Sequence, residues 1–348
     1  MKKTRILAIF ASLSMLFTAV SAQASSGGPS DEHRSEHQRI VEFWTHERVA
    51  QAVPRDFVLD ITTGKFTPSR GKPPGTPGGG GGGDDSGVVT GASWNGGGEV
   101  DGAVGKVLFE MDGSYYVCSA TVIDDGSDDS GQDDTALILT AAHCVYDEVN
   151  RAFAGMWMFV PDYDNDPAPL TATGSFCADT THGCWTPEAM AVHIGYAGAG
   201  GFNDQAVLYD FAVVRVGPGG LDDNSELDEV VKEQGYSFSA VSFGTAGYAF
   251  GYPAQKKWKG SDLIYCAGPI DGDPYNDDNT YRMNECKLNG GSSGGGWMAP
   301  FSESTGSGTL VSVNSYGYTG VNAMHGPILN EDTQDVYDAA KGEGGIVP

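Results

Sequence analysis

From residue 86 to the C-terminus, the sequence consists of short apolar runs separated by glycine, aspartate, asparagine and proline. β-Branched and aromatic residues favour strands, and the residues between the runs favour tight turns. The pattern predicts strands near residues 104–111, 115–123, 136–140, 156–160, 211–216, 240–244 and 309–315. Helices are expected only near residues 225–234 and 331–341. Such a region predicts one all-β barrel or sandwich, or two small barrels packed together.

The N-terminal part of the chain has a different composition. Residues 1–24 contain three basic residues, an apolar stretch and then Ala22-Gln23-Ala24, an order typical of a secretory signal peptide. A retained membrane anchor is the alternative. Residues 31–53 favour a helix that ends before Pro54, and the Pro-rich and Gly-rich residues 69–85 predict a linker. We therefore expect a signal peptide over 1–24, a short segment with its linker over 25–85, and the main domain over 86–348.

An exported chain meets an oxidising compartment, which makes its six cysteines informative. Their even number predicts disulfides, although six cysteines allow 15 pairings. Pairing successive cysteines is the simplest arrangement: Cys118 with Cys144, Cys177 with Cys184, and Cys266 with Cys286. The sequence has no C-x-x-C, so a structural zinc site is not expected. We expect a secreted protein, with periplasmic residence as the alternative.

The formal charge of −26 is concentrated in the main domain. Residues 1–24 carry +3 and residues 25–83 are neutral, so the chain from Asp84 onward carries −29. A surface this acidic repels nucleic acid and anionic lipid. Neither is expected as a partner, and no membrane contact is expected once the signal peptide has been removed.

Three stretches contain residues suited to proton transfer and nucleophilic attack. His143 ends a strand-like run beside Cys144, where a disulfide would fix its backbone. Asp210 opens the apolar run LYDFAVVRV, and a buried carboxylate there needs a partner such as a histidine. A structural histidine and a turn aspartate are the alternative interpretations of these two residues.

Ser293 lies in the stretch NGGSSGGGW, residues 289–297. Glycines before the serine allow backbone N–H groups to face a developing oxyanion, and those after it leave room for a substrate backbone. A Gly/Ser connector is the alternative. However, Cys286 and Trp297 flank the stretch, and both residue types are usually buried.

The motifs T-A-A-H-C, D-F-A-V-V and G-x-S-G-G contain His143, Asp210 and Ser293 in that order. Together they resemble the trypsin-like (chymotrypsin-fold) serine protease family, in the bacterial secreted branch that includes glutamyl endopeptidases. The resemblance covers residues of about 100–330. Shorter similarities are VHIGY (192–196), FGYP (250–253) and NSYG (314–317), the last at the family's substrate-binding segment.

The resemblance implies two packed six-stranded antiparallel β-barrels with a catalytic triad in the cleft between them. It implies that His143 takes the proton of Ser293 and passes it to the leaving amine, while Asp210 orients the imidazole. The oxyanion hole would consist of the N–H groups of Gly291 and Ser293. Ser315, Tyr316 and Gly317 would contact substrate. Such a protein would be a monomeric endopeptidase that cleaves proteins or peptides and requires no cofactor.

Some positions depart from the family pattern. Ser292 stands where digestive-type members have an aspartate that pairs with a freed N-terminus. We therefore expect a zymogen in which removal of the propeptide, residues 25 to about 85, uncovers or stabilises the cleft. Lys287 lies six residues before Ser293, where the family lines its primary specificity pocket, and His325 is a second basic candidate. Both suggest a preference for acidic P1 residues; the alternative for each is an ordinary surface residue.

Three acidic clusters, residues 124–134, 161–167 and 271–279, remain outside these motifs. Asp162, Asp164 and Asp166 alternate as calcium ligands can, but a complete calcium loop also needs a following glycine and a distal glutamate. We expect solvated acidic loops and no catalytic metal, with Ca²⁺ as a possible structural stabiliser.

Two other functional classes compete with an active protease. In α/β-hydrolases, G-x-S-x-G is the nucleophile elbow, but there the acid and the histidine follow the serine. Here only His325 follows Ser293, and the residues after Ser293 do not resemble a helix. The other alternative is a catalytically inactive protease-fold protein that serves binding or adhesion. The presence of all three triad residue types disfavours it.

Overall fold

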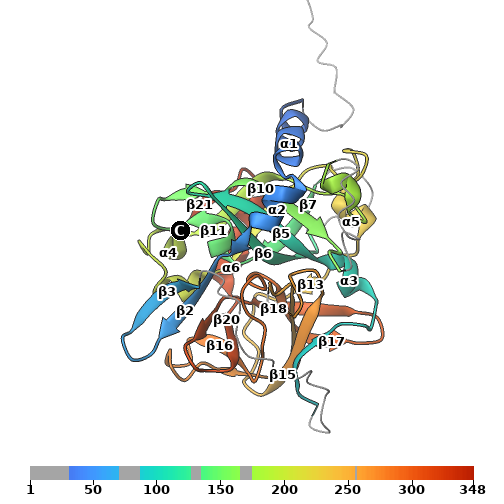
Figure 1. Ribbon diagram of the computed structural model, residues 1–348. Coiled ribbons are helices and arrows are strands. Elements are labelled where there is room, and N and C mark those ends of the chain that lie inside the picture. Colours follow the sequence, from blue (N-terminus) through green and yellow to red (C-terminus); the bar gives the residue numbers. More distant parts are fainter. Residues whose placement is uncertain (1–30, 70–86, 127–134, 165–174, 255–256) are drawn as a thin grey trace, which may run out of the picture.

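The computed structural model describes residues 31–69, 87–126, 135–164, 175–254 and 257–348. The predicted signal peptide, most of the predicted linker and parts of two acidic clusters, Asp166 among them, lie outside the described residues. Figure 1 shows two β-sheets packed one above the other, with the helices around them.

The first sheet is built on six antiparallel strands from the N-terminal half of the main domain. In sheet order these are β10 (Gly155–Pro161), β5 (Val104–Met111), β6 (Ser114–Ile123), β7 (Ala136–Thr140), β12 (Ala212–Val216) and β11 (Pro187–His193). Their apolar sequences explain the burial, since β7 (ALILT) is buried along its whole length. Two short strands add to this sheet in parallel: β21 (Gly345–Val347) beside β11, and β1 (Val53–Pro54) beside β6.

The second sheet also contains six antiparallel strands. In order these are β18 (Ser307–Val313), β17 (Gly296–Ser302), β14 (Thr245–Gly251), β15 (Ile264–Gly272), β16 (Thr280–Asn284) and β20 (Ala323–Pro327). Five further strands extend it: β13 (Gly235–Tyr236), β19 (Tyr316–Tyr318), β2 (Asp56–Asp60), β3 (Lys65–Ser69) and β4 (Val89–Ser93). A separate hairpin pairs β8 (Tyr146–Asp147) with β9 (Ala152–Phe153).

Helices in the described residues are mostly short. They are α1 (Asp31–Phe43), α2 (His46–Gln51), α3 (Glu99–Ala103), α4 (Ile194–Ala197), α5 (Leu227–Val230) and α6 (Glu331–Lys341), with 3₁₀ turns η1 (Ala142–Cys144), η2 (Cys177–Asp179) and η3 (Ala206–Tyr209). α6 begins with a capping box between Asn330 and Thr333, which satisfies backbone N–H groups at its first turn. An all-β architecture of two packed six-stranded antiparallel units, with little helix, is therefore confirmed.

Three elements differ from the sequence-based expectations. The expected helix over residues 31–53 is divided into α1 and α2, with residues 44 and 45 between them. Residues 240–244 do not form a strand: the backbone turns at Gly244 (φ +87°), and the strand β14 begins one residue later. The expected helix over 225–234 shortens to the four residues of α5.

The N-terminal segment, residues 31–69, packs onto the main domain. Its side chains Ile40, Trp44, Phe57 and Leu59 belong to the same buried apolar cluster as the first sheet. The indole N–H of Trp44 donates to the carbonyl of Met156 in β10 (2.6 Å). Figure 1 shows α2 against the upper sheet and the β2–β3 hairpin beside both sheets.

Candidate active site

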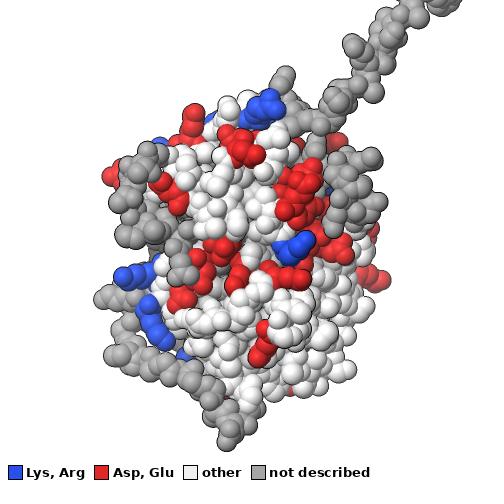
Figure 2. All heavy atoms as spheres, turned by 90° about the vertical axis from the view of Figure 1, so that its right-hand side faces the viewer, with Lys and Arg blue, Asp and Glu red and all other residues white. Residues whose placement is uncertain are grey.

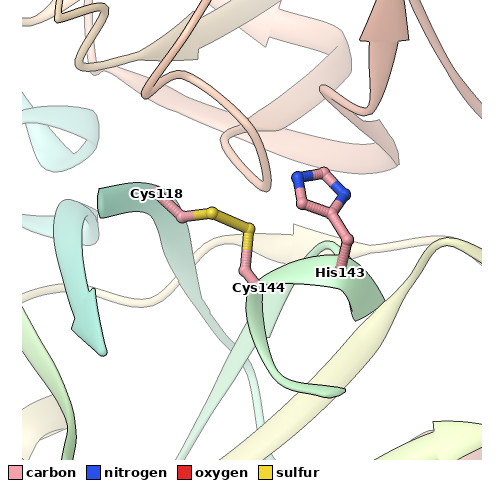
Figure 3. A group of neighbouring side chains, drawn as sticks. All are labelled: Cys118, His143 and Cys144. Carbon is pink, nitrogen blue, oxygen red and sulfur yellow. A yellow bond between two sulfur atoms is a disulfide. The ribbon is translucent and has the colours of Figure 1, made fainter. Parts of the chain in front are cut away.

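His143 lies in the 3₁₀ turn η1, directly after strand β7, and is fully buried. The next residue, Cys144, is joined to Cys118 of β6, with 6.2 Å between the Cα atoms. Figure 3 shows this disulfide on the turn that carries the histidine. The cross-link holds the turn against the sheet, and a proton-transferring group needs such fixed geometry.

Asp210 holds His143 through two hydrogen bonds. Its Oδ1 accepts the backbone N–H of His143 (2.8 Å), and its Oδ2 pairs with Nδ1 of the imidazole (2.7 Å). A carboxylate can only accept, so Nδ1 carries the hydrogen and Nε2 is left as the acceptor. The hydroxyl of Ser315 also donates to Oδ2 (2.5 Å). Asp210 is fully buried, and these three donors offset the cost of burying its charge.

Ser293 lies in a tight turn that enters strand β17 and is 4 % exposed. Gly294 adopts φ +83°, and a Cβ added there would lie 2.1 Å from Oγ1 of Thr140. Gly291 adopts φ +96°, which also favours glycine. The glycines in this stretch therefore permit the turn to fit against β7, and they do not form a loose connector.

Asn314, which was not predicted from the sequence, clamps this turn. Its side-chain amide donates to the carbonyls of Phe250 (2.7 Å) and Ser292 (2.9 Å), and its Oδ1 accepts the indole N–H of Trp297 (2.7 Å). Its backbone carbonyl accepts the N–H of Gly294 (2.7 Å). The signal that could have identified it is its place in NSYG, directly before the expected substrate-binding residues.

The hydroxyl of Ser293 donates to Asp56, a residue of the N-terminal segment. The distance from Oγ to Oδ1 of Asp56 is 2.9 Å, and the same Oδ1 accepts the N–H of Gly291 (3.3 Å). Nε2 of His143 is buried and has no hydrogen-bond partner among the described residues. Burial raises the pKa of Asp56, while the hydrogen bond from Ser293 opposes that shift. The sequence offered no sign of this contact, because 237 residues separate the two positions.

The predicted substrate-binding residues Tyr316 and Gly317 lie in strand β19, which pairs in parallel with β2 of the N-terminal segment. Phe202, which was not predicted, lies beside His143. Its ring packs edge-on against His143 (5.8 Å between centroids) and against Phe66 (5.1 Å). This aromatic surface adjoins the imidazole and is covered by the N-terminal segment.

Lys287 contacts strand β4. Its backbone N–H donates to the carbonyl of Thr90 (2.9 Å), and its ammonium lies 3.2 Å from Oγ1 of the same threonine. The side chain is half-buried.

His325 is fully buried in β20, where its ring stacks on Tyr316 (5.1 Å between centroids). Burial lowers its pKa to about 4, although Asp273, 3.8 Å from Nε2, favours the charged form. The ring is therefore neutral near pH 7, which does not favour a role in binding acidic side chains. Asp273 accepts hydrogen bonds from the hydroxyls of both Tyr316 (2.7 Å) and Tyr318 (2.6 Å), which lie in strand β19, and so helps to hold that strand in place.

Cys118, His143 and Cys144 offer ligand atoms within 4.8 Å of one another, close enough to hold a metal ion. Both sulfurs belong to one disulfide, however, and a disulfide provides no thiolate. Among the acidic clusters, Asp162 pairs with His182 (3.3 Å) and Asp164 accepts the N–H of Leu263 (3.2 Å). Burial, and then the charges of these two aspartates, raise the pKa of Asp101 to about 6.

The six cysteines form the bonds Cys118–Cys144, Cys177–Cys184 and Cys266–Cys286, which is the successive pairing. Within the part of the chain that is described, no helix is long and apolar enough to cross a membrane. On the face shown in Figure 2, acidic side chains are widespread and basic ones few, as the charge of −26 requires.

Several solved structures with a similar fold are serine proteases. The protease Anisep from Arthrobacter nicotinovorans is 32 % identical, with a TM-score of 0.56, over 72 % of this chain and 98 % of that chain. The thermostable serine protease AL20 from an extremophilic microorganism is 28 % identical, with a TM-score of 0.55, over 69 % of this chain and 97 % of that chain. A Glu endopeptidase is 20 % identical, with a TM-score of 0.49, over 74 % of this chain and 98 % of that chain.

No protein-family model matches the sequence, and no curated protein matches it either. The identity to Anisep nevertheless extends over nearly all of that protease, and the fold and the order of His143, Asp210 and Ser293 agree with the motifs in the sequence. The chain belongs to the trypsin-like, chymotrypsin-fold serine protease family.

Proposed function

We propose that the protein is an exported serine endopeptidase in which His143, Asp210 and Ser293 form the catalytic triad. The observation that carries the proposal is the pair of hydrogen bonds that Asp210 accepts from the backbone N–H and the imidazole of His143. This arrangement fixes the tautomer that a general base requires, with a free Nε2. Ser293 supports it, because its turn lies against the strand that leads into the histidine.

In the proposed reaction, Oγ of Ser293 attacks the carbonyl carbon of a peptide bond while Nε2 of His143 takes the hydroxyl proton. The oxyanion that develops is stabilised by backbone N–H groups, with Gly291 as one donor and Ser293 as the other. His143 then gives its proton to the leaving amine, and an acyl-enzyme remains. Water, activated by the same imidazole, hydrolyses that ester and releases Ser293. The chain's own groups supply every proton transfer, so we propose that catalysis requires no cofactor.

The proposed substrates are proteins or peptides, with strand β19 pairing with the backbone of the substrate. An acidic P1 preference remains part of the proposal and rests on Lys287 rather than on the buried, neutral His325. We further propose that the enzyme is a monomer that binds neither nucleic acid nor membranes, because the main domain is strongly acidic.

Residues 1–24 are proposed to be a signal peptide and residues 25–85 a propeptide. Export into an oxidising compartment is supported by the three disulfides. Ca²⁺ is proposed only as a stabiliser, which a comparison of melting temperature with and without a chelator would test.

The test compares the processed protein with its Ser293→Ala variant on a diverse peptide mixture, with cleavage sites determined by mass spectrometry. We expect cleavage only by the unaltered enzyme, with a rate at least 10³-fold above the variant. The residues before the cleaved bonds report the P1 preference, and an excess of Glu or Asp there would support the role of Lys287. Equal rates, or no cleavage by either protein, would contradict the proposal and favour an inactive binding protein with this fold.

A further inference from the structure

The N-terminal segment crosses the active site as added strands of both sheets. β1 lies beside β6, with Val53 opposite Tyr116, and β2 lies beside β19, with Phe57 opposite Tyr316. Residues 53–60 therefore span the boundary at which the first sheet supplies His143 and the second supplies Ser293. In this position the segment covers the strand that is proposed to pair with substrate.

Three consecutive side chains of this segment contact the site. Arg55 donates to the carbonyl of His143 (2.5 Å) and forms a buried ion pair with Glu148 (2.9 Å). Phe57 stacks face to face on Phe202 (3.9 Å between centroids) and packs edge-on against the imidazole (5.6 Å). Between them, Asp56 points at the nucleophile.

The carboxylate of Asp56 has the charge and the contacts of an oxyanion. Its Oδ1 accepts from the N–H of Gly291, a proposed oxyanion-hole donor, and from the hydroxyl of Ser293. While Ser293 donates to Asp56, its proton is directed away from His143, whose Nε2 is unpartnered among the described residues. A carboxylate carbon is a poor electrophile, so Ser293 has no reactive carbonyl in front of it. The segment occupies the site without being its substrate.

Contacts outside the site hold the segment as well. Trp44 is fully buried and its indole N–H donates to a carbonyl of β10, and Ile40 and Leu59 are buried in the same cluster. Burial of these apolar side chains stabilises the contact between the segment and the main domain. These contacts do not depend on residues 70–86, so a cut in that stretch leaves them in place.

We propose that residues 31–69 are a separable inhibitor of the main domain, whose Asp56 carboxylate occupies the oxyanion position and accepts the hydroxyl of Ser293. This inference rests on the proposed function, since an inhibitor requires an enzyme. It adds that cleavage between residues 70 and 86 does not by itself activate the protein. Activity appears only when the cut fragment dissociates or is destroyed, and the fragment inhibits a second copy from which it is missing.

The experiment uses the full chain with a site-specific protease sequence placed within residues 70–86. The chain is cut, diluted in steps, and assayed with a fluorogenic peptide; sedimentation velocity at the same concentrations measures how much fragment remains bound. We expect no activity before the cut and, after it, activity that increases on dilution in parallel with fragment loss. The concentration of half-activation then reports the dissociation constant.

Two variants isolate the role of the carboxylate. Asp56→Ala removes the acceptor of two hydrogen bonds and is expected to weaken fragment binding by roughly 10- to 100-fold. Glu47→Ala, the matched control, removes an acid of the same segment whose side chain is exposed. It is expected to leave the dissociation constant within about twofold.

Each outcome decides a different point. A cut chain that is fully active at every concentration overturns the inference, and so does an equal effect of the two variants. If the fragment dissociates and the main domain stays inactive, the proposed function fails instead. In that case sedimentation of the two variants still determines whether Asp56 holds the fragment.

Discussion

Neighbouring residues hold each side chain of the site in a fixed position. Asp210 is fixed by Ser315, a residue of the other half of the molecule, as well as by His143. Ser293 is fixed by glycines whose conformations no other residue adopts easily, and by the amide of Asn314. The geometry of the proposed triad therefore depends on neighbouring residues that hold its side chains in place.

Gly294→Ala tests that dependence. The new Cβ would be 2.1 Å from Thr140 at a backbone φ of +83°. Strain and overpacking together are expected to lower the free energy of unfolding by roughly 3–5 kcal/mol and to reduce kcat/KM at least 100-fold. Urea unfolding and peptide hydrolysis would measure the two effects. Gly113→Ala is the control, because Gly113 has a similar φ (+70°) and open space around it. A similar small loss in both variants would show that the packing against Thr140 is unimportant.

The burial of His325 predicts that the stability of the fold depends on pH. Its pKa is lowered to about 4 by burial, whereas in the unfolded chain it is about 6.5. The unfolded state therefore binds the extra proton first, and stability is lost as the pH falls from 6.5 toward 4. The charges of Asp273 and Arg282 act on the ring in opposite directions and are included in that pKa.

The full loss attributable to His325 is about 3 kcal/mol at 1.4 kcal/mol per pKa unit. The variant His325→Gln is expected to lose correspondingly less stability between pH 7 and pH 4.5 than the unaltered protein. Urea unfolding at both pH values measures the difference. Parallel pH profiles would mean that another group, not His325, controls acid sensitivity.

At the scale of elements, the sequence predicted those strands whose apolar side chains fill a sheet. β5, β6, β7, β10 and β12 lie within a residue or two of their predicted ranges. β14, with the sequence TAGYAFG, was missed because its glycines resemble turns. A Cβ at Gly247 would lie 2.5 Å from Ile270, and one at Gly251 would lie 2.8 Å from Ser292. Those glycines are required by close packing, which only the folded neighbours reveal.

The residues of the site also divide into those that a local motif identifies and those that only the folded structure reveals. His143, Asp210 and Ser293 carry local motifs, so the sequence could identify them. Asp56, Phe202 and Asn314 act through partners distant in the chain and have no motif of their own. Gly64 (φ +63°) lies in the turn that joins β2 to β3, but no local pattern says which strand a hairpin will pair with.

The end of helix α1 is expected to contribute strongly to binding of the N-terminal segment. Trp44, the residue directly after this helix, is fully buried, and its indole N–H donates a hydrogen bond to β10. Trp44→Ala is expected to cost roughly 3 kcal/mol or more, and thus to raise the dissociation constant of the cut fragment at least 100-fold. Glu42→Ala, an exposed change in the same helix, is the control. Dilution of the cut chain measures the dissociation constant of each variant fragment. Equal dissociation constants would mean that Trp44 does not hold the fragment on the main domain.

The whole molecule carries a charge of −26, and acidic side chains cover more of the face seen in Figure 2 than basic ones. Self-repulsion of this kind destabilises the compact state, and salt screens it. The melting temperature is expected to rise by several degrees as NaCl increases from 10 to 150 mM, since the screening length falls from about 30 Å to about 8 Å. Sucrose of equal osmolality is the control for solvent effects. A fall in melting temperature with salt would indicate that attractive ion pairs outweigh the repulsion.

Ser293 and Ser315 belong to one half of the molecule, whereas His143 and Asp210 belong to the other. A chain that has folded only one half holds either a serine without its base or a base without its serine. Such a chain has no assembled triad, even before the N-terminal segment has reached its place. In the proposed protease, division of the site between two halves would therefore delay hydrolysis until both halves have folded, independently of any inhibitor.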